Sequence, residues 1–237
     1  MCSVIDMSDE KVSAPRVWEQ PIDSGPSPEN NATFDAIVVG GGPGGASAAG
    51  YLAKGGKKVL FIEKSVWPRD KICGDAVGGK SLSHVRELGV KEILEATPHF
   101  RVTGIKFSSP KGHIVRVPLP EEDVEKMEAG YSLPRAQFDH LLFDACQKLV
   151  RDAGGMVLQG GDVREVLYDD DCGGEDPGSG SKESRHASGV VVRVGGRDGE
   201  EFTFHSRQLV GAAGYRCPVA VSLVEDTYSE KMVDRTH

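Results

Sequence analysis

The hydrophobic and polar positions of the chain change their period several times, and each change indicates an element. Ala36 to Val39 is a short apolar run, which predicts a fully buried parallel strand. Glycines follow this run, and the small residues after them predict a helix. A second apolar run, Lys58 to Glu63, predicts the next strand. The first ordered part of the chain is therefore expected to be a strand–helix–strand unit of an α/β fold.

The middle of the chain alternates between helical and extended periods. Apolar positions predict helical structure over residues 80–96, where Gly89 can cap the first helix and residues 91–96 form another turn. A further helix is predicted over residues 136–151. The buried stripe expected on this helix comprises Phe138, Leu141, Leu142, Ala145 and Leu149. Between the helices, residues 102–107 and 113–117 predict a hairpin that interrupts the α/β alternation and indicates a second sheet. Residues 121–128 are expected to form a solvated acidic face.

The last third of the chain is dominated by extended segments. Strands are expected at residues 156–159, 162–168, 190–194 and 201–205, and a last one enters a glycine-containing turn after Gln208. Residues 169–188 are rich in Asp, Gly and Ser, which predicts an acidic loop or insertion. Residues 1–33 are polar and lack periodicity, so they are expected to form a disordered leader.

Composition narrows the classes of function. The 237-residue chain carries a net charge of −8, which argues against nucleic acid as a partner, and no basic stripe is strong enough to overrule it. Its five cysteines are odd in number and contain no C-x-x-C, which indicates reduced thiols, a cytosolic compartment and no zinc site. Residues 36–53 are uncharged, but their glycines and proline make a poor membrane span. The acidic, polar start of the chain is not a secretory signal.

The glycine cluster after the first strand has the spacing of a dinucleotide-binding motif. Gly40, Gly42 and Gly45 satisfy G-x-G-x-x-G. The first glycine permits the tight turn, the second allows a pyrophosphate to approach the backbone, and the third allows close packing of helix and strand. The helix N-terminus then supplies free N–H groups and partial positive charge. Alternatively, the glycines serve only a turn of a strand–helix–strand unit.

An acidic residue stands where a ribose would need it. Glu63 ends the second strand, 18 positions after Gly45, and could accept hydrogen bonds from both ribose hydroxyls of an adenosine. A carboxylate disfavours a 2′-phosphate, so FAD or NAD(H) is expected in preference to NADP(H). The following loop, residues 64–75, contains Arg69 and Lys71, which could meet phosphates, and Gly74, which suits a close approach to a flat ring. The alternative for this loop is a solvated basic turn.

The assembled pattern resembles the p-hydroxybenzoate-hydroxylase-like FAD oxidoreductases and, within them, the geranylgeranyl reductase family. The resemblance covers residues 34–225. It rests on the glycine motif with Glu63 and on the segments Pro68-Arg-Asp-Lys-Ile-Cys-Gly-Asp75, Leu133-Pro-Arg-Ala-Gln-Phe-Asp139 and Val210-Gly-Ala-Ala-Gly-Tyr-Arg-Cys-Pro-Val219. The Cys-Gly-Asp loop is the most specific of these pointers. The fold implied is a Rossmann-like FAD-binding domain with a parallel sheet, plus part of an antiparallel substrate-domain sheet.

The resemblance also implies roles for particular residues. The glycines would meet the FAD pyrophosphate, Glu63 the adenosine ribose, Arg135 the FAD backbone, and main-chain groups of Val163 the adenine. The cofactor-binding residues expected in full are Gly40, Gly42, Pro43, Gly44, Gly45, Glu63, Lys64, Gly74, Asp75, Arg135, Val163, Gly211 and Gly214. Cys73 would lie near the isoalloxazine as the candidate catalytic residue, positioning substrate or relaying a proton. The alternative for Cys73 is a small apolar filler.

The chain departs from the family pattern in two respects. Ala213-Gly214 and Cys217 replace an expected Asp-Gly pair and a serine, which removes a polar contact near the cofactor. The family's C-terminal half has no counterpart here, so the chain is interpreted as the N-terminal part of a longer protein or a truncated product. The implied division is an FAD-binding domain at 34–97 and 132–225, a substrate-domain hairpin at 98–131, an acidic loop at 169–188 and a tail at 226–237.

The function implied is an FAD-dependent oxidoreductase that reduces C=C bonds of geranylgeranyl or other isoprenoid chains, in lipids or tetrapyrroles. NADPH, ferredoxin or another donor would supply the electrons. The cytoplasmic location is expected from the cysteines, and peripheral membrane contact is expected only because prenyl-lipid substrates reside in membranes. An FAD monooxygenase of the same fold is one alternative, and a nucleotide-binding fragment without catalysis is another. A disulfide reductase is disfavoured, because Cys73 has no neighbouring cysteine and there is a single glycine motif.

Overall fold

The computed structural model describes residue 25 and residues 27–71, 75–126, 129–169 and 186–228. Two predicted site residues, Cys73 and Gly74, and most of the predicted acidic loop lie outside the described residues. The helices are α1 (Pro43–Lys54), α2 (Ser81–Glu87), α3 (Lys91–Glu95), α4 (Glu121–Glu125), α5 (Arg135–Asp152) and α6 (Pro218–Tyr228).

The strands form four sheets. Their bounds are β1 (Ala32–Phe34), β2 (Ala36–Val39), β3 (Val59–Glu63), β4 (Ala76–Val77), β5 (Phe100–Arg101), β6 (Gly104–Ser108), β7 (Ile114–Pro118), β8 (Tyr131–Ser132), β9 (Met156–Gln159), β10 (Gly161–Asp169), β11 (His186–Val194), β12 (Glu200–Ser206) and β13 (Leu209–Gly211). The sheet orders are β13-β2-β3-β9, β1-β12-β11-β10, β4-β8-β5 and β6-β7.

The central sheet β13-β2-β3-β9 is parallel throughout and is covered on both faces. Successive side chains of a strand point to opposite faces. Val38 and Phe61 accordingly pack with helices α1 and α5 on one face. Ile37 and Leu60 pack with the β1-β12-β11-β10 sheet on the other face. This burial on both sides explains why β2 and β3 are uninterrupted apolar runs.

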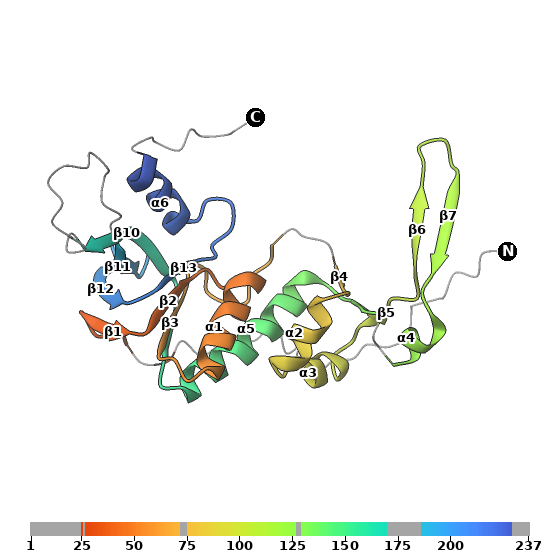
Figure 1. Cartoon of the computed structure of the whole chain (residues 1–237), viewed down its shortest axis with the longest axis horizontal. Helices are drawn as coiled ribbons and strands as arrows, with labels where there is room; N and C mark the ends of the chain where they lie inside the picture. Colours follow the sequence, from red (N-terminus) through yellow and green to blue (C-terminus); the bar gives the residue numbers. More distant parts are fainter. Residues whose placement is uncertain (1–24, 26, 72–74, 127–128, 170–185, 229–237) are drawn as a thin grey trace, which may run out of the picture.

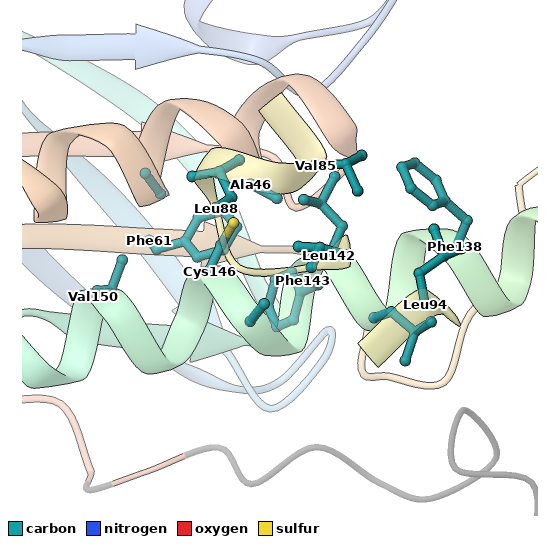
Figure 2. Close-up of a cluster of buried hydrophobic side chains, with 14 of the residues drawn as sticks. Ala46, Phe61, Val85, Leu88, Leu94, Phe138, Leu142, Phe143, Cys146 and Val150 are labelled. Atoms are coloured by element: carbon teal, nitrogen blue, oxygen red, sulfur yellow. The ribbon is translucent and has the colours of Figure 1, made fainter. Parts of the chain in front are cut away.

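Small residues on α1 bring this helix close to α5. Figure 2 shows Ala46, on α1, near Phe61, Phe143 and Cys146 in one buried cluster. A side chain at Gly50 would place its Cβ only 2.9 Å from Cys146 Sγ, so the packing requires a glycine here. The rings of Phe61 and Phe143 lie 4.9 Å apart. Full burial of each aromatic side chain contributes about 2–3 kcal/mol, which fixes the helix layer on the sheet.

The predicted α5 is confirmed, and its buried surface is wider than the predicted stripe. Phe138, Leu141, Leu142 and Ala145 are buried, and Leu149 is partly buried against the same cluster. Phe143, Cys146 and Val150 are buried as well. The helix lies between the sheet and α2–α3, so it contacts neighbours on more than one side (Figure 1).

A small sheet and a separate two-stranded ribbon lie beyond the helix layer. The sheet β4-β8-β5 holds Tyr131, whose hydroxyl donates to Glu95 Oε1 at 2.8 Å. The ribbon β6-β7 projects away from the rest of the molecule (Figure 1). It confirms the hairpin predicted between the two helices, with bounds shifted by one or two residues.

Three predicted boundaries need correction. The leader was expected to extend to residue 33, but Ala32–Phe34 forms β1 and pairs in parallel with β12. The side chain of Asn30 fixes this strand by accepting a hydrogen bond from the backbone N–H of Thr203 at 2.7 Å. The acidic loop predicted at 169–188 is shortened at both ends, because β10 and β11 remain paired as far as Asp169 and His186.

The third correction concerns the predicted tail at 226–237. Helix α6 begins at Pro218 and continues to Tyr228, so it extends into that tail. The helix is attached to the second sheet through Val219, which is buried there, and through a 2.9 Å hydrogen bond between Tyr168 Oη and Ser222 Oγ. No helix of the described residues is long and apolar enough to cross a bilayer.

Candidate functional site

A cavity of about 410 Å³ opens at the carboxyl ends of β2 and β3. This is the edge at which ligands bind in open α/β sheets. The lining combines glycines, two carboxylates and several cationic side chains. The lining residues are Val39, Gly40, Gly42, Ile62, Glu63, Lys64, Ser65, Arg69, Lys71, Gly161, Asp162, Val163, Ala212, Ala213, Arg216 and Pro218.

A side chain at each glycine of the motif would meet different surroundings, so each position holds glycine for a different physical reason. Gly40 has φ +113°, and a Cβ there would lie 2.5 Å from the carbonyl oxygen of Ala212. A Cβ at Gly45 would lie 1.7 Å from the carbonyl oxygen of Gly40, so this glycine lets α1 pack against the end of β2. A Cβ at Gly42 would meet only Arg69 Nη2, at 3.7 Å. The fold thus requires glycine at positions 40 and 45, whereas position 42 is open toward the cavity.

The first turn of α1 leaves its amides available. Gly42 is the N-cap, it makes no side-chain capping hydrogen bond, and Pro43 follows at the first helical position. No acidic residue lies in this turn. The N–H groups that begin a helix have no partner within the helix and carry partial positive charge. Gly44 and Gly45, in this turn, therefore belong to an anion-binding geometry next to Gly42, which lines the cavity.

Glu63 is held rigidly at the end of β3. Its Oε2 accepts a hydrogen bond from the backbone N–H of Gly41 at 2.6 Å, and its Oε1 accepts one from Ser65 at 2.8 Å. The residue is only 7% exposed, yet it lines the cavity. A Cβ at Gly41 would lie 2.7 Å from Oε2. Gly41, between the first two glycines of the motif, therefore makes room for this carboxylate.

Arg69 lines the cavity beside the start of α1. Its guanidinium carbon lies 4.6 Å from the ring centre of Trp67, a cation–π contact, and Nη2 lies 3.6 Å from Glu63 Oε2. Its buried Nε has no hydrogen-bond partner among the described residues. A buried donor without a partner carries a free-energy cost of about 1–3 kcal/mol. The arrangement therefore fits an anionic or hydroxylated ligand.

Lys64 and Asp162 also line the cavity, and both belong to an ion-pair network. Lys64 Nζ lies 3.0 Å from Asp162 Oδ1, and Arg164 Nη1 lies 3.2 Å from Asp162 Oδ2. Partial burial opposes ionisation of Asp162, but the hydrogen bonds from the two cations outweigh it and lower the pKa of this carboxyl. Val163 follows on β10, paired with Val192, at the floor of the cavity.

A second cleft of about 240 Å³ lies on the other side of the start of α1. Pro43, Ser47 and Arg135 are among its lining residues. Arg135 is fixed by an ion pair with the buried Asp139, one turn along α5, and its backbone N–H donates to Asp75 Oδ1 at 3.2 Å. The residues at the start of α1 thus line both clefts.

The predicted site residues fall into three groups in the structure. Gly40, Gly42, Glu63, Lys64 and Val163 line the large cavity, with Gly44 and Gly45 in the adjoining helical turn. Pro43 and Arg135 line the second cleft, where Asp75 holds the backbone of Arg135. Gly211 ends β13, and Gly214, with φ +83°, lies in the following turn.

Sequence reasoning missed several lining residues. Ser65 and Arg216 line the large cavity without having been named as site residues. Arg216 lies two residues after the Gly-Ala-Ala-Gly turn, and that position was the available signal. Among the described residues, no three His, Cys, Asp or Glu side chains converge in a geometry that could hold a metal ion.

Comparison with known proteins places this geometry in context. The family model described as "FAD binding domain" matches residues 33–170. A menaquinone reductase of Mycobacterium tuberculosis is 30% identical over 189 residues, which are 80% of this chain and 40% of the relative. A digeranylgeranylglycerophospholipid reductase of Methanocella arvoryzae is 29% identical over 78% of this chain and 40% of the relative.

A solved structure is similar in fold. The myxobacterial chondrochloren halogenase CndH, described as an FAD-dependent halogenase, has a TM-score of 0.63 and 25% identity. The match covers 78% of this chain and 38% of the halogenase. The chain therefore spans about two fifths of the length of these three relatives.

Proposed function

Because this chain belongs to the FAD binding domain family, we propose that it is the cofactor-binding portion of an FAD-dependent oxidoreductase that reduces C=C bonds of isoprenoid chains. Family membership confirms the predicted α/β fold class and the FAD cofactor. The relatives also confirm the resemblance to geranylgeranyl-type reductases. The reaction, the isoprenoid substrate and the electron donor, NADPH or ferredoxin, are parts of the proposal.

The observation that carries the proposal is the pairing of Gly42 with Glu63 in one cavity. Position 42 is open toward the cavity, and the carboxylate is fixed by two backbone N–H groups at 2.6 and 2.8 Å. The residues fit the adenosine diphosphate half of FAD. Glu63 would accept from the ribose, the amides of Gly44 and Gly45 would bind the diphosphate, and Arg69 would satisfy its free Nε on the same ligand.

The second cleft would hold the part of the cofactor that continues toward the flavin. Pro43 and Ser47 line it from α1, and Arg135 lines it from α5. Asp139 keeps the Arg135 guanidinium fixed on the helix, so the guanidinium would orient the ribityl chain without large rearrangement. Bound FAD supplies the hydride chemistry, and the protein's task is to orient cofactor and substrate and to exclude water.

Cys73 is proposed as the residue at the reacting end, from the sequence motif alone. It lies outside the described residues, between Lys71 and Asp75. Because Asp75 Oδ1 accepts from the backbone of Arg135, the end of this loop is tied to the second cleft. In that place, a thiol would position the alkene or relay a proton. The isoprenoid substrate is supported by the name of the digeranylgeranylglycerophospholipid reductase relative.

The proposal is tested in two steps. Purified chain is first titrated with FAD, and binding at one flavin per chain is expected. Reduced flavin complex is then incubated with a geranylgeranyl lipid without oxygen, and mass spectrometry should show the gain of two hydrogens per double bond. Cys73→Ala should retain FAD and lose reduction, while Cys172→Ala, in the predicted acidic loop, serves as the cysteine control. Absence of FAD binding would overturn the proposal. FAD binding without reduction of the lipid would support cofactor binding and contradict the proposed C=C reduction.

An FAD monooxygenase or halogenase is the second candidate, because the solved relative with TM-score 0.63 is an FAD-dependent halogenase. Oxygen separates the two candidates: product formed only in the presence of oxygen would favour this alternative. A nucleotide-binding fragment without catalysis is the third candidate. It is supported by the chain's span of about two fifths of its relatives, and FAD binding without any turnover would favour it.

A further inference from the structure

Trp67 is buried against the guanidinium of Arg69. The indole is 1% exposed, and its ring centre lies 4.6 Å from the guanidinium carbon of Arg69. The rings of Phe143 and His140, both on α5, lie 5.0 and 5.8 Å from the indole. Figure 2 shows Phe143 within the buried cluster to which Trp67 also belongs. The position of the indole is therefore set by neighbours within this chain.

The backbone of Trp67 is fixed at the same sheet edge as the carboxylate of the site. Its N–H donates to Gln159 Oε1 at 2.9 Å, and Gln159 is 5% exposed. Gln159 ends β9 and stands directly opposite Glu63 in the parallel β3–β9 ladder. Side chains in register on neighbouring strands point to the same face of a sheet. The strand ends therefore place Glu63 directly, and they place Arg69 through Gln159 and Trp67.

The guanidinium held in this way lies between two parts of the cavity. Arg69 Nη2 is 3.6 Å from Glu63 Oε2. It is also 3.7 Å from the place that a Cβ at Gly42 would occupy, where α1 begins. The Arg69 side chain is 14% exposed and lines the cavity. A cation at this place would meet the phosphates of a nucleotide whose ribose is hydrogen-bonded to Glu63.

The contact with Arg69 distinguishes Trp67 from an ordinary core residue. Trp67 Nε1 has no hydrogen-bond partner among the described residues, so the indole N–H does not fix the side chain. A buried tryptophan usually has such a partner, and phenylalanine or leucine would fill a core without that polar atom. The indole face is the best aromatic surface for a cation, and the planar guanidinium of arginine stacks on it. The face of the ring is therefore the part of Trp67 that serves the site.

From these contacts, we propose that Trp67 is a positioning residue that holds Arg69 in place for the diphosphate of the bound nucleotide. The inference rests on the proposed FAD site and adds a determinant of its selectivity. A long side chain loses conformational entropy when it binds a ligand, and stacking on the indole removes part of that loss beforehand. Cation–π contacts in desolvated surroundings change an equilibrium constant by about 5- to 30-fold. Trp67 should favour ADP over adenosine by about that factor.

ADP and adenosine are the probes for this test, because the residues expected to bind them all lie in this chain. Both are titrated into the 237-residue protein, and the ratio of the two affinities is measured by NMR. Trp67→Leu should lower the preference for ADP by about 5- to 30-fold. Trp67→Phe keeps an aromatic face and should retain most of the preference. A change that merely loosened the fold would lower both affinities together and leave their ratio unchanged.

Three further variants make the test specific. Phe204→Leu alters a fully buried ring of the other core cluster, outside the cavity lining, so it should lower stability and leave the ratio unchanged. Gln159→Met removes the acceptor for the Trp67 N–H and should lower the ratio by less than Trp67→Leu does. If Trp67→Leu does not fold, Gln159→Met decides, since the expected direction is the same. In an Arg69→Met background, Trp67→Leu should have no further effect on the ratio.

The free protein supplies a readout that needs no ligand. The ring current of the indole should shift the side-chain protons of Arg69 upfield in the NMR spectrum. Trp67→Leu should abolish this shift, and Phe204→Leu should preserve it. Arg69 protons at ordinary positions in the wild type would mean that the stack does not form, which would overturn the inference.

The outcomes separate this inference from the proposed function. An unchanged ADP preference in folded Trp67→Leu, or an equal effect of Trp67→Leu with and without Arg69, would overturn the inference and leave FAD binding untouched. Loss of the ADP preference in Trp67→Leu, with a wild type that does not reduce the lipid, would support the inference and contradict the proposed reaction. A wild-type chain that binds no ADP would overturn the inference together with the FAD site.

Discussion

Two glycines of one motif should respond in opposite ways to the same substitution. The perturbations are Gly42→Ala and Gly45→Ala. In the structure, a Cβ at position 42 is 3.7 Å from its nearest neighbour, Arg69 Nη2, and φ at this residue is −71°. A Cβ at position 45 is 1.7 Å from the carbonyl oxygen of Gly40. The first variant is compatible with the fold, and the second is not.

The magnitudes follow from these contacts. Gly42→Ala should change the free energy of unfolding by no more than about 0.5 kcal/mol, since it meets an ordinary van der Waals contact. It should weaken FAD binding by about 10- to 100-fold, because the methyl group stands where the diphosphate approaches and disrupts one charge-assisted hydrogen bond of about 1.5–3 kcal/mol. Gly45→Ala should destabilise the fold by more than about 3 kcal/mol, because α1 has to move away from β2.

The assay combines urea unfolding, monitored by circular dichroism, with FAD titration, monitored by flavin fluorescence. Gly55→Ala is a matched control at the other end of α1. It makes the same substitution at an exposed residue with φ −78°, far from the cavity. It should retain the FAD affinity of the wild type.

Either of two results would refute the reasoning. Wild-type FAD affinity in Gly42→Ala would mean that the diphosphate does not approach this backbone. Wild-type stability in Gly45→Ala would mean that the helix and strand are not packed as the structure has them.

Three further outcomes are expected. Arg69→Met should weaken FAD binding by about tenfold or more in a fluorescence titration. Lys148 is an exposed cation on α5, so Lys148→Met should leave FAD affinity unchanged. Equal losses of affinity in the two variants would contradict the role of Arg69. Burial lowers the pKa of His140 below 6.5, so the unfolded chain takes up a proton that the folded chain does not, and stability should fall as the pH drops below about 6.5. His140→Leu should reduce this loss in urea unfolding at about pH 5.5 and 7.5, and an unchanged pH dependence would contradict it. Burial raises the pKa of Cys146 to about 12, so iodoacetamide at about pH 8 should leave this thiol unmodified until the protein unfolds, as read by mass spectrometry.

Strong local patterns made the central unit predictable. The apolar runs at 36–39 and 58–63 became β2 and β3, because both strands are buried on both faces. The spacing from Gly45 to Glu63 also placed the carboxylate at the correct edge of the sheet, since parallel strands end together.

Features that depend on distant contacts could not be predicted in this way. The cation–π contact of Arg69 with Trp67 and its approach to Glu63 arise from the path of a loop without any period. The sequence pattern assigned no role to Gly41, and only the structure shows that it makes room for the Glu63 carboxylate. Helix α6 did have a local signal, because Pro218 stands at its start and apolar residues follow.

The position of Gly40 against Ala212 has a consequence for biosynthesis. These residues are 172 positions apart, and β13, which brings Ala212 to the cavity, pairs with β2 near the other end of the chain. Non-local pairings of this kind form slowly, and a nascent chain cannot make them before the later strand leaves the ribosome. A nascent chain shorter than about 210 residues would carry the whole glycine motif and still lack one wall of its cavity. Cofactor capture is therefore expected to follow the synthesis of β13, which makes the flavin a check on completion of this part of the protein.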